Sequence, residues 1–175
     1  MNREDRINKF KNSLAYEALP AEFSAWLMES AFFTAPASTK YHGSHEGGLF
    51  DHSFLVMENL VHLTHDNDLV WDRKESPYIV GLLHDMCKID QYHLVDIDKY
   101  EYDTETLFKG HGDKSVMLIS AHMRLTPEEV TCIRYHMGAF TEKEEWGFYT
   151  RAVHAFPNVL WTHHADMIAS HIQGV

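Results

Sequence analysis

Residues 79–90 (IVGLLHDMCKID) carry side chains that could hold a metal. The apolar residues before His84 and Asp85 favour a buried helix, which would place this imidazole and carboxylate side by side in the core. Lys88 follows about one turn later and can share their face. A buried His–Asp pair is costly to desolvate unless it is paired or metal-bound, and it offers nitrogen and oxygen ligands to a transition metal. The alternative is an ordinary core histidine beside an aspartate that is hydrogen-bonded to backbone.

Further residues of ligand type stand in apolar or glycine-flanked contexts along the chain. Together with the pair above, they make a set of six on five predicted helices or helix ends: His52, His84, Asp85, His111, His136 and Asp166. This spread suits a bundle that holds a metal site between facing helices. Four imidazoles and two carboxylates exceed the needs of one structural zinc, and the chain has no CxxC pair. The set matches two transition metals bridged by Asp85.

Hydrophobic periodicity predicts the elements that would position these residues. Expected helices cover residues 2–19, 21–33, 49–65, a central segment from 76 through the His–Asp pair, 113–123, 126–137, 142–155 and 158–172. Residues 91–109 alternate apolar and polar side chains and predict a short β-hairpin or an extended excursion. The expected fold is all-α, a helical bundle with a small β-hairpin insertion. We expect one domain, residues 1–175, with an N-terminal helical extension (1–33) and a metal-binding core (41–170).

Residues 34–48 form a predicted loop directly before the helix of His52, by their Pro, Gly and Ser content. The loop carries Lys40, Tyr41, His42 and His45, so we interpret it as a rim of an active-site mouth. The alternative is an ordinary surface connection with exposed histidines.

The composition narrows the class of protein. Hydrophobic residues make up 45% of the 175 residues, as in globular domains. No apolar run approaches the ~20 residues of a membrane span. The net charge of −11 argues against broad nucleic-acid binding, although a small phosphorylated substrate remains compatible with it. The charged, amphipathic N-terminus is unlike a signal peptide, and two cysteines without motif spacing favour a reducing, cytoplasmic location.

The six ligand-type residues, taken in order, resemble the HD-domain superfamily. His52 matches the first histidine, His84-Asp85 the HD pair and Asp166 the distal aspartate. The segment LLHDMCK resembles the HDxGK variant, with Cys87 where glycine is common. His111 in KGHGDKS and His136 in RYHMG match the two extra histidines of the binuclear branch. The resemblance covers roughly residues 41–170.

This resemblance implies an enzyme, a metal-dependent phosphohydrolase acting on a phosphoester of a nucleotide or another small phosphorylated metabolite. It implies that His52, His84, Asp85 and Asp166 hold one divalent metal, and that Asp85, His111 and His136 hold the other. Catalysis would depend on Asp85 and Lys88. Lys88 would contact a substrate phosphate or the attacking hydroxide, and His42 or His45 would donate to the leaving group.

The resemblance also bears on the metals. A third metal in some relatives needs a glutamate one turn before the first histidine, where this chain has Gly48. We therefore expect two ions. Iron, manganese, nickel and zinc all suit such a histidine-rich site.

Two other functions remain open at the level of sequence. Some HD-superfamily proteins use the same six ligands for a mixed-valent diiron oxygenase, and Lys88 suits either chemistry. A non-catalytic module that binds a nucleotide is the third possibility. The aromatic first two helices could also supply a homo-oligomer interface.

Overall fold

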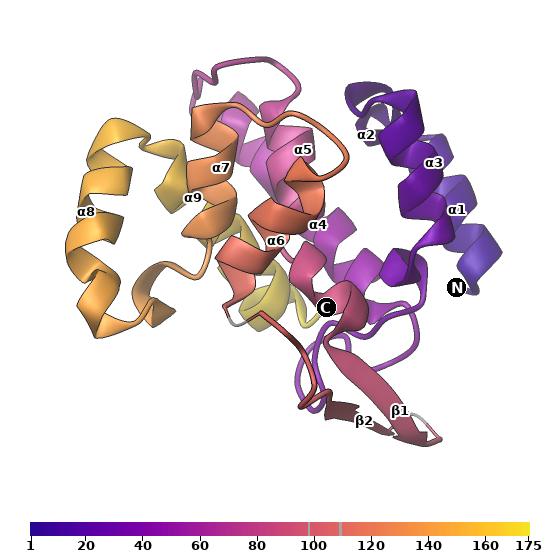
Figure 1. Ribbon diagram of the computed structural model, residues 1–175. Coiled ribbons are helices and arrows are strands. Elements are labelled where there is room, and N and C mark those ends of the chain that lie inside the picture. The colour runs from indigo at the N-terminus through magenta and orange to yellow at the C-terminus, as the bar shows by residue number, and fades with distance from the viewer. Residues whose placement is uncertain (98, 109) are drawn as a thin grey trace.

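The computed structural model describes residues 1–97, 99–108 and 110–175 and is mostly helical, with one two-stranded antiparallel hairpin (Figure 1). Asp98 and Lys109, which fall in the predicted hairpin segment, lie outside the described residues. The prediction of an all-α fold with a small β-hairpin is confirmed. The helices and strands are α1 (Arg3–Lys11), α2 (Leu14–Ala18), α3 (Ala21–Glu29), α4 (Gly48–Asp66), α5 (Ser76–Leu83), β1 (Tyr92–Asp96), β2 (Lys99–Tyr102), α6 (His111–Ser120), α7 (Pro127–Arg134), α8 (Trp146–Ala155) and α9 (Asn158–Met167).

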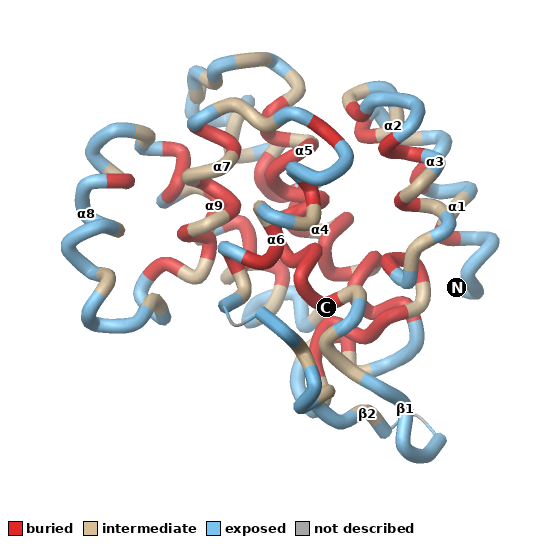
Figure 2. Tube along the Cα trace, in the orientation of Figure 1, coloured by how far each residue is buried: buried red, intermediate tan, exposed pale blue. Residues whose placement is uncertain are grey.

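Helix α4 is the longest helix and lies against both α5 and α9. The buried positions of α4, α5 and α9 face one another, while the outer faces of the bundle are exposed (Figure 2). Gly81 allows α4 and α5 to approach closely, because a Cβ there would lie 2.5 Å from the Cα of Met57. The close crossing brings the start of α4, with His52, toward the end of α5, with His84.

The N-terminal helices pack on the start of α4 through aromatic side chains. Phe33 lies with its ring centroid 5.8 Å from that of Phe10 and 5.0 Å from that of Phe50. Arg6 of α1 is buried and forms a two-pronged ion pair with Asp51, the residue before His52, with donor–acceptor distances of 3.0 and 2.7 Å. The packing and the ion pair together fix α1 against the first turn of α4.

Several predicted helices are shorter than expected. The predicted helix 2–19 breaks between α1 and α2, and this break leaves Leu14 exposed. The predicted helix 21–33 ends at Glu29 and continues as a 3₁₀ turn, Ala31–Phe33. The predicted helix 142–155 begins as a 3₁₀ turn, Lys143–Glu145, ahead of α8. The last helix changes after Met167 into a π-helical segment, Ile168–Gln173.

Helix α7 begins where the sequence predicts. Thr126 is the N-cap: its Oγ1 accepts a hydrogen bond from the backbone N–H of Glu129 at 3.2 Å. The backbone N–H of Thr126 donates in return to Glu129 Oε2 at 2.9 Å. This reciprocal capping satisfies two backbone donors and fixes the start of the helix that leads to His136.

The two acids in the first turn of α7 are buried, and they join α7 to other elements. Glu129 accepts hydrogen bonds from Arg73 through both carboxylate oxygens, each at 2.7 Å, and from the Ser76 hydroxyl at 2.9 Å. Glu128 accepts one from the side-chain amide of Asn158 at 2.8 Å. These contacts hold the starts of α5, α7 and α9 together and so set the relative positions of the helices that carry the site.

The expected continuous helix through the His–Asp pair is wrong. Helix α5 ends at Leu83, and Asp85 has φ −105° and ψ 25°, outside the helical region. A 3₁₀ helix, η2 (Met86–Asp90), follows directly. Lys88 still reaches Asp85, because the 3₁₀ turn aligns residues three apart. The break turns the chain so that Cys87 faces α6, where its backbone N–H donates to the Ser115 hydroxyl at 3.0 Å.

The β1–β2 hairpin projects from the bundle (Figure 1). Tyr92 pairs with Tyr102 at its base, and their ring centroids lie 5.0 Å apart. Among the described residues, no helix is both long and apolar enough to cross a membrane.

Candidate metal centre

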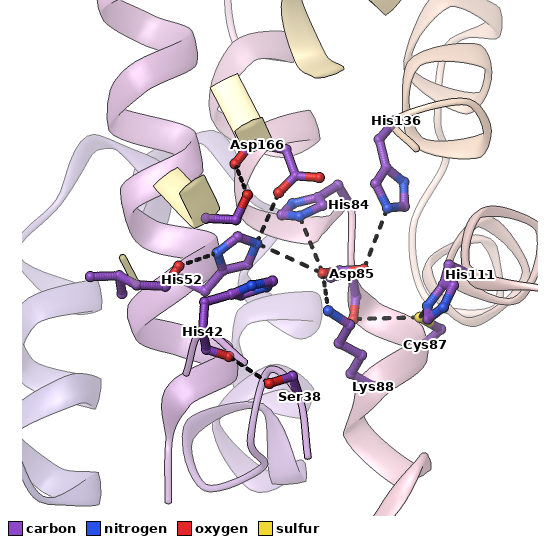
Figure 3. Close-up of polar contacts among 12 residues, drawn as sticks. Ser38, His42, His52, His84, Asp85, Cys87, Lys88, His111, His136 and Asp166 are labelled. Carbon is purple, nitrogen blue, oxygen red and sulfur yellow. Dashed lines mark hydrogen bonds and ion pairs between the residues drawn. The ribbon is translucent and has the colours of Figure 1, made fainter. Parts of the chain in front are cut away.

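Five of the six predicted ligands converge on one buried point between α4, α5, α7 and α9 (Figure 3). Two overlapping groups of ligand atoms, each with all separations within 4.8 Å, contain His52, His84 and Asp85, and His84, His136 and Asp166. All five residues are at least nine-tenths buried. The prediction that side chains from separate helices meet in the core therefore holds for these five.

The three histidines all turn the same nitrogen toward this point. In each ring, Nδ1 contacts a backbone oxygen. Because a backbone oxygen can only accept a hydrogen bond, each Nδ1 must carry the proton that it donates. In each ring, Nε2 is then the nitrogen whose lone pair could bind a metal, and it has no hydrogen-bond partner among the described residues. Nδ1 of His52 lies 2.8 Å from the backbone oxygen of Val175. Nδ1 of His84 lies 2.9 Å from that of Gly81, and Nδ1 of His136 lies 2.7 Å from that of Ile133.

The separations between ligand atoms fit an ion at the centre. His84 Nε2 lies 3.4 Å from one Asp85 oxygen, and His136 Nε2 lies 3.4 Å from the other. His52 Nε2 lies 3.3 Å from Asp166 Oδ1. Two donors that each bind one ion at about 2.1 Å with a tetrahedral angle lie about 3.4 Å apart. Asp85 Oδ1 also has no hydrogen-bond partner among the described residues, although it is fully covered. The donor set therefore fits a transition metal.

Lys88 balances part of the negative charge. Its Nζ lies 2.6 Å from Asp85 Oδ2, and both side chains are buried. Burial alone would raise the pKa of Asp85, but the charges of Lys88 and His84 outweigh it and hold that pKa well below its usual range. Burial alone would lower the pKa of Lys88, but the Asp85 carboxylate outweighs it and raises that pKa. The pair is therefore charged at neutral pH.

His136 and Asp166 respond to the same surroundings. Burial would lower the pKa of His136, but contact with the Asp85 carboxylate reverses the effect and raises it. Burial would raise the pKa of Asp166, but contact with His52 and the nearby imidazoles lowers it instead. The centre therefore favours a positive charge, whether a proton or a metal ion.

His111, the sixth predicted ligand, lies on the other side of Asp85. Its closest ligand-type partner is Cys87, with 3.5 Å between His111 Nδ1 and Cys87 Sγ. Asp85, Cys87 and His111 form a third group with all separations within 4.8 Å. The predicted trio of Asp85, His111 and His136 does not form such a group among the described residues. The turn at Asp85 instead directs Cys87 toward the start of α6, where it meets His111.

A cavity of about 610 Å³ opens onto Asp85, Lys88, His111 and Asp166. His42 lines it, and its ring centroid lies 4.7 Å from that of His52. Burial, with help from His52 and Lys88, lowers the pKa of His42 to about 4. His42 is therefore a neutral imidazole at pH 7.

The predicted role of His45 is not supported by its position. Its side chain is exposed, it does not line this cavity, and its Nδ1 contacts the backbone oxygen of Glu46 at 3.1 Å. The loop turns away from the cavity after Gly43, which has φ +58°.

Gly48, where a third-metal site would need a glutamate, packs tightly against the loop that carries His42. A Cβ on Gly48 would lie 1.9 Å from the backbone oxygen of Gly43. A side chain at position 48 would therefore require the loop that carries His42 to move, and the number of metal ions stays a prediction.

Sequence reasoning missed several residues at the site. The contact from Val175 to His52 joins residues 123 apart in the chain, and no local pattern signals it. Tyr102 and Phe140 line the cavity. Tyr102 could have been found from its register opposite Tyr92 in the predicted hairpin. Sequence reasoning assigned Cys87 no role at the site, yet its buried thiol lies 3.5 Å from His111 Nδ1.

Comparison with known proteins adds no family to this picture. No protein-family model matches the chain, and no curated protein or solved structure was found to match it. What can be said of the site therefore rests on its residues and their geometry: an all-α protein with buried histidine and aspartate groups that could hold a metal ion.

Proposed function

We propose that this protein is a metal-dependent phosphohydrolase of the HD-domain type, which cleaves a phosphoester of a nucleotide or other small phosphorylated metabolite at a binuclear centre. One observation carries the proposal: three buried Nε2 atoms and one buried Asp85 oxygen converge without hydrogen-bond partners beside a cavity. Leaving four such polar atoms unpaired is costly unless a bound group satisfies them.

Metal ions bound here would stabilise negative charge on a phosphoryl group and make water a better nucleophile at neutral pH. His52, His84, His136, Asp85 and Asp166 would hold the metal on one side, and Asp85 and His111 would face the other. Iron, manganese, nickel and zinc are the ions that suit these donors.

Lys88 supplies the charge for substrate binding. Its ammonium group is buried at the cavity wall and stays protonated beside Asp85, so it can bind a non-bridging phosphate oxygen. Because Asp85 already neutralises this lysine in part, the phosphate binds most favourably when a metal draws charge from the carboxylate.

His42 can orient the substrate. As a neutral imidazole it has one N–H donor and one acceptor nitrogen, and its ring lines the cavity beside His52. With a pKa of about 4, it carries almost no proton to transfer to a leaving group at pH 7. Its proposed role is therefore a hydrogen bond to the substrate.

The cavity wall favours a nucleotide over a purely polar phosphate. Tyr41, Tyr92, Tyr102 and Phe140 line it, and Tyr41 and Phe140 are 81% and 63% exposed. Exposed aromatic rings beside a phosphate-binding group provide faces on which a nucleobase can stack, each worth about 1–3 kcal/mol.

The test begins with metal analysis of the purified protein, followed by a phosphoester screen with each ion under anaerobic conditions. We expect phosphate release without oxygen, and a loss of about 100-fold or more in turnover for Asp85→Asn. The matched control is Asp66→Asn on exposed α4 surface, which should turn over at the wild-type rate. Turnover that requires oxygen would favour an oxygenase instead. Metal-loaded protein that cleaves no phosphoester would overturn the proposal.

A further inference from the structure

Cys87 lies against the candidate centre in a way that the function proposed above does not use. Its side chain is fully buried on η2, and its Sγ is 3.5 Å from His111 Nδ1. The ligand atoms of Asp85, Cys87 and His111 all lie within 4.8 Å of one another. Figure 3 shows the thiol beside the His111 ring, on the side of Asp85 away from His52.

The separation of 3.5 Å admits two interpretations. The first is a weak S–H···N hydrogen bond in a packed interior. The second is two ligands of one ion: a sulfur at about 2.3 Å and a nitrogen at about 2.05 Å, separated by a tetrahedral angle, lie about 3.6 Å apart.

The adjacent carboxylate favours the second interpretation. Asp85 Oδ1 is buried and has no hydrogen-bond partner among the described residues. A thiol hydrogen bond to His111, or to the Asp85 backbone oxygen 3.8 Å away, would leave that oxygen unsatisfied, whereas an ion bound by Asp85, Cys87 and His111 would bring a positive charge to the carboxylate.

We propose that Cys87 is a metal ligand, and that with Asp85 and His111 it forms a sulfur-containing half of the binuclear centre. This inference rests on the proposed metal centre and makes that centre asymmetric. The half with His52, His84, His136 and Asp166 offers nitrogen and oxygen donors only. On binding, the thiol loses its proton to solvent and the sulfur lone pair forms the bond to the ion, with no change of oxidation state.

The consequence is a preference for a thiophilic ion in this half. Thiolate ligands favour zinc and iron, whereas manganese prefers oxygen and nitrogen donors. Cys87→Ser should therefore weaken zinc binding to one site by about 100-fold or more, since even groups that only orient metal ligands typically account for 10–100-fold. Manganese binding should change much less.

Cobalt(II) substitution tests the inference directly, without measuring activity. Metal-free protein is titrated anaerobically with Co²⁺, and its absorption is recorded. We expect ligand-field bands together with an intense thiolate-to-cobalt charge-transfer band in the near ultraviolet. Cys87→Ser should lose the charge-transfer band and keep the ligand-field bands.

Cys132→Ser is the matched control. Cys132 is equally buried, on α7, but belongs to none of the candidate ligand groups among the described residues. This variant should retain the charge-transfer band. The assignment would be overturned if Cys132→Ser lost the band and Cys87→Ser kept it.

The wild-type spectrum alone keeps the inference testable if a variant fails to fold. Ligand-field bands without a charge-transfer band would refute Cys87 as a ligand and leave the metal centre standing. Failure to bind Co²⁺ at all would overturn both this inference and the proposed function.

Discussion

Replacing Lys88 by methionine isolates the electrostatic logic of the centre. The ammonium lies 2.6 Å from the Asp85 carboxylate, and the two residues are 8% and 3% exposed. Without the lysine, metal-free protein would retain an uncompensated buried carboxylate, which costs about 3–5 kcal/mol. In a chain of this length, 1 kcal/mol shifts Tm by about 2–4 °C, so Lys88→Met should lower the Tm of metal-free protein by about 10 °C.

Metal should rescue this variant, because bound cations replace the missing positive charge beside Asp85. In metal-loaded protein we expect a loss below about 1 kcal/mol, or no more than ~3 °C. Thermal unfolding at pH 8, with and without chelator, measures both differences. The alkaline pH limits proton uptake by His136, whose pKa is raised by Asp85 against the effect of burial.

Two controls sharpen the experiment. Lys74→Met removes an exposed lysine at 3.8 Å from Glu75 and should change stability by less than about 0.5 kcal/mol. The double variant Lys88→Met/Asp85→Asn should recover much of the loss in metal-free protein, because the unpaired charge is gone. Equal destabilisation with and without metal would refute the view that an ion neutralises Asp85. No destabilisation of the metal-free variant would refute the buried-pair argument.

Three further outcomes follow from the same contacts. Chelating the metal from protein held at 100 times its Kd should remove about 2.7 kcal/mol of stability, seen as a lower Tm, whereas chelator should leave the Tm of Asp85→Asn unchanged. Glu129→Gln should lower the free energy of unfolding in urea by about 2–3 kcal/mol, since a neutral amide cannot accept hydrogen bonds from Arg73 and Ser76 as the carboxylate does. A urea midpoint equal to that of wild type would contradict the role of Glu129. His42 has a pKa lowered from 6.5 to about 4, so its contribution to stability is fully present above about pH 6.5 and is lost as the pH falls toward 4. Between about pH 7 and about pH 4.5, the Tm of metal-free His42→Gln should therefore fall by less than the Tm of metal-free wild type. An equal fall in both proteins would count against the lowered pKa of His42.

Local sequence signals determined the parts of this protein that depend on neighbouring residues. The apolar stripe of α4, the Thr126 cap of α7 and the alternation in the hairpin were each readable within one element. The ligand-type residues were also visible, because a histidine in an apolar or glycine-flanked context is conspicuous in sequence. These signals were sufficient to predict an all-α fold and the five residues that converge.

Local signals did not reveal how charged residues are used across elements. Glu128 and Glu129 read as helix-start acids, yet both are buried and join α7 to α5 and α9. The side chain of Lys114, near the start of α6, is likewise buried and pairs with Asp90. In each case the partner lies tens of residues away, and only packing brings the two together.

What the sequence alone determined is the chemical inventory: which side chains can ligate a metal, and on which segments they stand. Only the tertiary structure decided which of these side chains lie together and which lie apart. The backbone turn at Asp85 brings Cys87 to His111, which joins Asp85 and Cys87 rather than His136, while the loop before α4 brings in His42 and leaves His45 outside. Periodicity sets the direction of a side chain relative to its own helix axis. The relative position of two helices depends on contacts summed over the whole core.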